Sequence, residues 1–85
     1  MIEFSYTLTI DEGLHARPAG NLVKKIQGYA EKVTITKNGK TIDGKRLFPI
    51  LNLQVKKGEQ IVIAVEGGNE ETVAKELKSY CESML

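Results

Sequence analysis

The chain has 85 residues and a formal net charge of +1 at pH 7, with 41% hydrophobic and 27% charged residues. This composition is typical of one soluble globular domain spanning residues 1–85, and the near-neutral charge gives no general attraction to nucleic acid or anionic lipid. No apolar run approaches the ~18 residues of a membrane span, and the single cysteine, Cys81, excludes an internal disulfide and suits a cytoplasmic location.

Strict alternation predicts the first strand over residues 2–10, where every even-numbered side chain from Ile2 to Ile10 is apolar or aromatic. From Ala16 the spacing becomes helical and predicts a helix over 16–27. Pro18 suits its first turn, where a missing N–H costs nothing. The apolar positions of this helix are Ala19, Leu22, Val23 and Ile26.

Three further strands are indicated along the chain. Residues 31–37 and 40–43 flank Asn38-Gly39, which predicts a type I′ hairpin because both residues tolerate positive φ. Residues 61–65 are apolar on both faces, so we expect this strand in the interior of the sheet.

Two more helices are expected. Residues 46–53 predict one or two helical turns, although Pro49 disfavours the helical conformation at Phe48. Asn69 can cap the last helix, with Glu70 and Glu71 at its positive dipole end. The apolar stripe predicted for this helix is Val73, Leu77, Tyr80 and Met84, with Cys81 beside it as a half-buried thiol.

The elements therefore follow the order βαββαβα. Four strands with one polar face, and helices against the other face, predict an α+β open-faced sandwich with a four-stranded antiparallel sheet.

The only histidine, His15, lies at the junction between the first strand and the first helix. A lone histidine in a small domain is most often structural or incidental. Here, however, it adjoins the unpaired backbone amides of a helix start, including those of Ala16 and Arg17, and the Arg17 side chain adds a permanent cation. This arrangement predicts an anion site with an imidazole at its edge.

The residues narrow the chemistry of such a site. No second histidine is present and Cys81 lies on a distant helix, so we expect no metal site. His15 has no motif-linked nucleophile of the Ser-His-Asp or Cys-His kind. The imidazole itself remains as the nucleophile, with a phosphoryl group as the natural anion.

At these positions the chain resembles the histidine-containing phosphocarrier (HPr) family of the bacterial phosphoenolpyruvate:sugar phosphotransferase system. The resemblance rests on Gly13-Leu14-His15-Ala16-Arg17-Pro18-Ala19, on Asn38-Gly39-Lys40 and on the order of elements. It implies that His15 accepts a phosphoryl group at Nδ1 from enzyme I and passes it to sugar-specific IIA domains, that Arg17 steadies the group, and that no cofactor is bound. A carrier of this kind is not itself an enzyme.

The chain departs from the family pattern in four places. Arg46 stands where some members have a regulatory serine, so the resemblance implies no serine switch here. Pro49 interrupts the second helix, Gly20 replaces a better helix former, and Glu12 adds a negative charge near His15. These departures leave open an alternative, an HPr-like regulatory or binding module without productive phosphotransfer.

Four residues resemble the surface that HPr offers its partners, namely Leu47, Phe48, Leu51 and Lys24. Leu47 and Leu51 could equally pack inward, whereas Phe48 falls off the apolar stripe and is expected to be exposed. Nucleic-acid binding by the open sheet is not expected, because the polar face of the first strand carries no aromatic residue. We expect a monomer.

Overall fold

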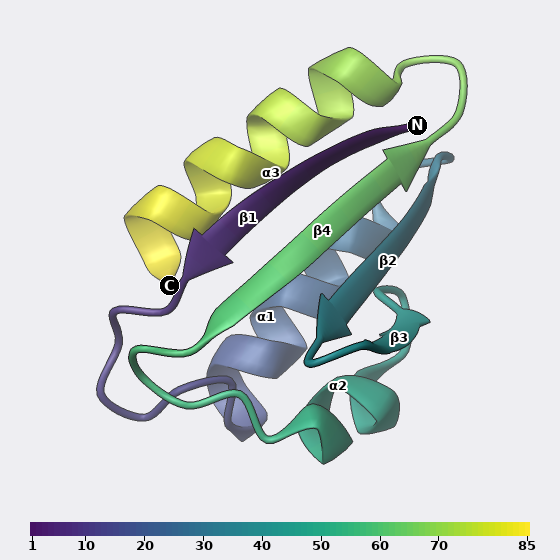
Figure 1. The fold of residues 1–85 in the computed structure, drawn as a ribbon. Helices are drawn as coiled ribbons and strands as arrows, with labels where there is room; N and C mark the ends of the chain where they lie inside the picture. The colour runs from purple at the N-terminus through teal and green to yellow at the C-terminus, as the bar shows by residue number, and fades with distance from the viewer.

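The computed structural model describes residues 1–85 and contains four strands and three helices (Figure 1). None of the helices combines the length and the apolar composition needed to cross a membrane. In chain order the elements are β1 (Ile2–Thr7), α1 (Ala16–Gln27), β2 (Lys32–Lys37), β3 (Lys40–Asp43), α2 (Leu47–Leu53), β4 (Gln60–Glu66) and α3 (Glu70–Met84).

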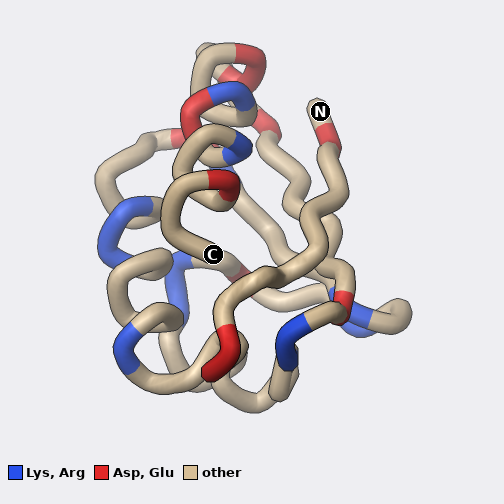
Figure 2. The backbone as a smooth tube through the Cα atoms, turned by 90° about the vertical axis from the view of Figure 1, so that its left-hand side faces the viewer, with Lys and Arg blue, Asp and Glu red and all other residues tan.

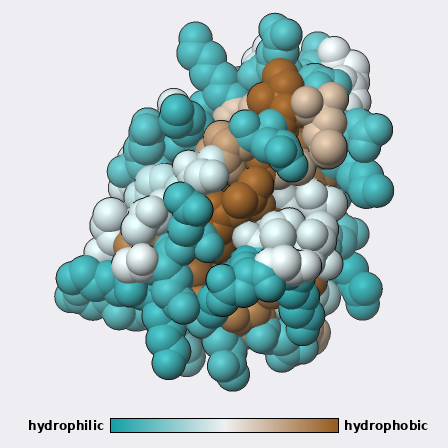
Figure 3. All heavy atoms as spheres, viewed as in Figure 1, coloured by the Kyte–Doolittle hydropathy of each residue, from teal (hydrophilic) through white to brown (hydrophobic).

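The strands form one antiparallel sheet in the order β1-β4-β2-β3. The helices α1 and α3 cover one face, and α2 lies at the end of the sheet beside β3 (Figure 1). The opposite face is open, and on it a narrow apolar band runs between hydrophilic side chains (Figure 3). The predicted α+β open-faced sandwich and the order of its elements are therefore confirmed.

The strand β4 is central, as its apolar composition predicts. Its inward side chains Ile61, Ile63 and Val65 are fully buried, and Ala64 on the other face is only 8% exposed. The edge strand β1 has the predicted alternation, but its inward side chains are only partly buried because β1 has a neighbour on one side alone. Nineteen buried residues form one continuous core between sheet and helices.

The first strand is shorter than the alternation predicts. It ends at Thr7, and residues 8–10 leave the ladder because β4 begins only at Gln60. The Leu8 amide instead donates to Glu59 O, and the amides of Thr9 and Ile10 both donate to Leu85 O. These bonds turn the chain toward the end of α3, and the following residues lead to the start of α1.

Two predicted local structures are confirmed. Asn38 (φ 49°) and Gly39 (φ 81°) both have positive φ in the β2–β3 hairpin, as a type I′ turn requires. The second helix spans Leu47–Leu53, and Pro49 occupies its first turn. A proline is harmless there because that N–H has no intrahelical partner.

The buried stripe of α3 differs from the prediction at its end. Met84 is 51% exposed and Tyr80 is partly buried, while Leu85 at 2% exposure takes the inward position. Cys81 is fully buried rather than half-buried, and burial raises the pKa of its thiol to about 12. Asn69 occupies the N-cap position but makes no side-chain capping bond.

Replacing Gly20 by alanine should stabilise the protein. Gly20 lies within α1, and a Cβ built there meets no heavy atom within 4 Å. The alanine reduces the conformational freedom of the unfolded chain without a clash, so we expect a gain of about 0.5–1 kcal/mol in the free energy of unfolding. Urea unfolding followed by circular dichroism measures this gain, and a loss of stability would show that the position is more crowded than the structure indicates.

Candidate functional site

His15 immediately precedes α1 and occupies its N-cap position. Its backbone is extended (φ −84°, ψ −175°), and its carbonyl accepts the first helical hydrogen bond, from the Ala19 amide at 2.9 Å. The side chain is exposed and makes no capping bond to the helix. The imidazole is therefore fixed at its base by the helix start but is free to react at its ring nitrogens.

The start of α1 leaves backbone amides without acceptors and carries no compensating negative charge. The amides of Ala16 and Arg17 donate to no group in the chain, and Pro18 has no N–H to donate. No acidic residue lies in the first turn, and α1 carries only basic charged residues whereas α3 carries both signs (Figure 2). The positive end of the helix dipole thus faces solvent beside His15, as the sequence predicts.

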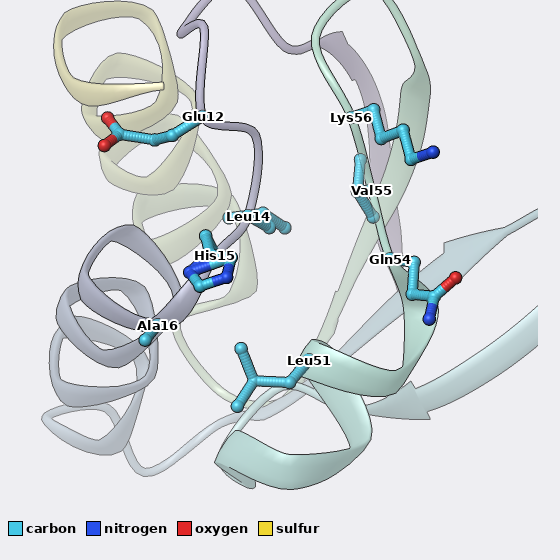
Figure 4. A pocket seen from close by; sticks show the side chains of 8 residues that line it. All are labelled: Glu12, Leu14, His15, Ala16, Leu51, Gln54, Val55 and Lys56. Carbon is cyan, nitrogen blue, oxygen red and sulfur yellow. The ribbon is translucent and has the colours of Figure 1, made fainter.

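A hollow of about 520 Å³ opens in front of this helix start (Figure 4). The imidazole of His15 lies between the beginning of α1 and the Leu51 side chain from α2, and faces the hollow. The hollow is lined by two segments, first Glu12, Leu14, His15 and Ala16, then Leu51, Gln54, Val55 and Lys56.

A backbone hydrogen bond joins the two segments next to the histidine. The Leu14 amide donates to the Val55 carbonyl at 2.9 Å. Gly13 has φ +66°, and a Cβ at this position would lie 2.4 Å from that same carbonyl oxygen. Only glycine allows both the left-handed backbone and this close approach, so Gly13 is a structural requirement of the site.

Arg17 is exposed and lines a second, smaller hollow of about 160 Å³ rather than the one that His15 faces. Glu12 is among the residues that line both hollows, and its side chain points away from Gln54, Val55 and Lys56 on the far wall (Figure 4). His15 and Arg17 therefore line separate hollows.

The remaining sequence-predicted residues lie around this centre. Phe48 is 73% exposed, whereas Leu47 and Leu51 are partly buried against the core, so each leucine has an inward and an outward part. Lys24 is exposed on α1, about 12 Å along the helix axis from its start. Arg46 is exposed at the N-cap of α2 and makes no capping bond.

Sequence reasoning missed the far wall of the hollow, which Gln54, Val55 and Lys56 form. Gln54 has a left-handed backbone (φ 52°, ψ 47°), which asparagine or glycine would have signalled and glutamine does not. Gly13, which lacks a Cβ, was the one residue in the sequence that could have indicated a close approach of another segment.

Gly13→Ala should disturb the site and the fold together. The added Cβ meets backbone atoms and the φ is unfavourable for alanine, so we expect a loss of about 1–3 kcal/mol in the free energy of unfolding. Urea unfolding measures it, with Gly20→Ala as the matched control of opposite sign. A neutral Gly13→Ala would contradict the close approach to Val55.

Comparison with known proteins gives a consistent result. Residues 2–83 match the family model described as PTS HPr component phosphorylation site. A phosphocarrier protein HPr of Borreliella burgdorferi is 42% identical over 71 residues, which cover 84% of this chain and 83% of that protein. That of Vibrio cholerae is 31% identical over 99% of both chains. The crystal structure of HPr from Thermoanaerobacter tengcongensis superposes with a TM-score of 0.93 at 30% identity, covering 99% of this chain and 94% of that one.

Proposed function

The chain belongs to the HPr phosphocarrier family of the phosphotransferase system, and we propose that it accepts a phosphoryl group on His15 from enzyme I and passes it to IIA domains. The observation that carries the proposal is the exposed imidazole beside the free amides of Ala16 and Arg17, at a helix start with no acidic residue in its first turn. The chain then acts as a stoichiometric intermediate and not as an enzyme.

In the proposed transfer, the lone pair of an imidazole nitrogen of His15, Nδ1 by resemblance to the family, attacks phosphorus. The new N–P bond forms while the bond that joins the phosphoryl group to enzyme I breaks, and the electron pair of the broken bond stays with enzyme I. The amides of Ala16 and Arg17 are placed to donate to the phosphoryl oxygens, each such charge-assisted bond contributing about 1.5–3 kcal/mol. The second transfer reverses these steps toward a IIA domain.

Besides the backbone amides, the guanidinium group of Arg17 supplies positive charge that stabilises the phosphoryl group. The Arg17 side chain is exposed and lines the smaller of the two hollows, so it is free to turn toward a phosphoryl group on His15. We propose no deeper basic cage. Two amides and one guanidinium hold the group firmly enough to shield it, yet release it to an acceptor.

Phosphorylation tests this function directly. Incubation with phosphoenolpyruvate and a cognate enzyme I should give one acid-labile, base-stable phosphate per chain, detected by intact mass. His15→Ala should abolish the phosphate because it removes the acceptor, and Arg17→Ala should slow its formation or transfer by about tenfold or more. A wild-type chain that no competent enzyme I labels would contradict the proposal.

The partner surface is proposed to centre on Phe48, an exposed aromatic side chain on α2, the helix whose Leu51 lines the His15 hollow, and to include Leu47, Leu51 and Lys24. Exposed aromatic residues are frequent binding hot spots. Phe48→Ala should raise the KM of enzyme I for this chain by about fivefold or more while changing the free energy of unfolding by less than about 0.5 kcal/mol.

Val62→Ala, on the open face of the sheet, is the control for this prediction. It also truncates a partly exposed apolar side chain, but away from the helices that carry the site. Equal KM values for the Phe48 and Val62 variants would place the docking surface elsewhere.

The alternative, a binding module without productive transfer, is favoured by one observation, the acidic residue Glu12 on the loop just before His15. A negative charge there opposes a phosphoryl group. We place the carrier first because the acceptor, the amides and Arg17 are all present. Arg46 offers no hydroxyl to a serine kinase, and we further propose a monomeric, cytoplasmic protein folded as one domain.

A further inference from the structure

Lys37, the last residue of β2, has the least exposed side chain among the ion-paired residues, at 14%. Its Nζ donates to Leu53 O at 3.0 Å and to Gln54 O at 2.9 Å, and lies 3.0 Å from Oε1 of Glu59. Three oxygen atoms therefore face the three N–H donors of the ammonium group.

The two carbonyls belong to the C-terminal end of α2. Gln54 is the C-cap of that helix, and its left-handed backbone is unfavourable for a residue with a Cβ. A cation on the last carbonyls of a helix satisfies acceptors that have no intrahelical partner and opposes the negative end of the dipole. Lys37 thus stabilises the conformation that Gln54 adopts.

Glu59 extends the same contact to the other end of the segment Gln54–Lys56. Its Oε1 also accepts the Lys56 amide at 2.7 Å, and the ammonium of Lys37, together with this amide, lowers the pKa of Glu59. Within the ion pair, Lys37 therefore binds the carbonyl groups of Leu53 and Gln54 at the start of the segment, and Glu59 binds the Lys56 amide at its end. The segment is also held by the Val55 side chain in the core and by two backbone hydrogen bonds, from the Gln54 amide to Leu51 O and from the Glu59 amide to Lys56 O, while the side chains of Gln54 and Lys56 are exposed.

The segment Gln54–Lys56 is the far wall of the hollow that His15 faces (Figure 4). In its middle, Val55 O accepts the Leu14 amide, and Leu14 is covalently joined to His15. A continuous set of contacts thus connects Lys37 with the histidine, although the lysine lies on a different element and does not line the hollow.

We propose that Lys37 is a positioning residue for His15, holding Gln54–Lys56 in the conformation that binds Leu14 and thereby fixing the imidazole against the start of α1. The inference rests on the proposed function, because its consequence is the rate at which His15 is phosphorylated. Lys37 acts through Val55 and Leu14 and touches no reacting atom.

The kinetic test compares full-length Lys37→Met and Lys37→Arg with Lys57→Met. Lys57 is the matched control because it also pairs with a carboxylate, Asp11 at 2.8 Å, but that pair is exposed and holds no backbone carbonyl. With phosphoenolpyruvate and this chain as the substrate, the kcat of enzyme I should fall about tenfold for Lys37→Met, and its KM for the chain should change less than twofold. Small displacements of a reacting group chiefly reduce kcat. Lys37→Arg should retain at least a third of kcat, and Lys57→Met should match the wild type.

A second measurement separates positioning from a loss of global stability. Lys37→Met should speed hydrogen exchange of the Leu14 amide at least tenfold more than that of an amide in the central strand, such as Ile63. Both defects should persist when Gly20→Ala restores global stability, with Gly20→Ala alone as reference. Full recovery of kcat in that background, or equal kcat for Lys37→Met and Lys57→Met, would overturn the inference.

The outcomes also distinguish the two proposals. A phosphorylated wild-type chain with an unchanged Lys37→Met rate overturns the positioning role alone. A wild-type chain that enzyme I leaves unphosphorylated overturns the proposed function and, with it, the kinetic consequence of the Lys37 contacts.

Discussion

The hydrogen bond from the Leu14 amide to the Val55 carbonyl is the interaction on which the site depends. It joins the loop before α1 to the segment after α2, about forty residues further along the chain. Gly13 must lack a Cβ for the two backbones to approach. The left-handed conformation of Gln54 precedes the Val55 carbonyl that faces the Leu14 amide. The sheet and the core hold these two loops at the same end of the molecule.

The positive potential at the start of α1 results both from the basic residues of the helix and from the absence of acidic ones. Its first turn has no carboxylate, its first two amides have no acceptor, and its only charged residues are basic. The positive potential is therefore not cancelled within the helix. Glu12, on the preceding loop, is the only acidic residue among those that line the hollow.

Much of the fold follows from the sequence because the signals are local. Alternation identifies the strands, helical spacing identifies α1, and Asn38-Gly39 identifies the hairpin. The errors arise where tertiary contacts override local pattern. Residues 8–10 continue the alternation but pair with Glu59 and Leu85, and Leu85 displaces Met84 from the core.

The site was predictable to a similar extent. His15, Arg17 and the amides of the helix start follow from one contiguous stretch, and so does the exposure of Phe48. The far wall does not, because a left-handed glutamine has no sequence signature and a lysine at the end of a strand is ordinarily solvated. Such contacts form between segments that are far apart in the sequence, and the periodicity of a single segment does not reveal them.

The distance in sequence between Leu14 and Val55 has a consequence for how the protein is made. The loop that their contact closes contains α1, β2, β3 and α2, so the contact forms only after those elements have come together. A nascent or partly unfolded chain carries the complete histidine signature but lacks the wall behind it. The loop that carries His15 should therefore reach its final conformation late in folding, after the contacts that are local in sequence.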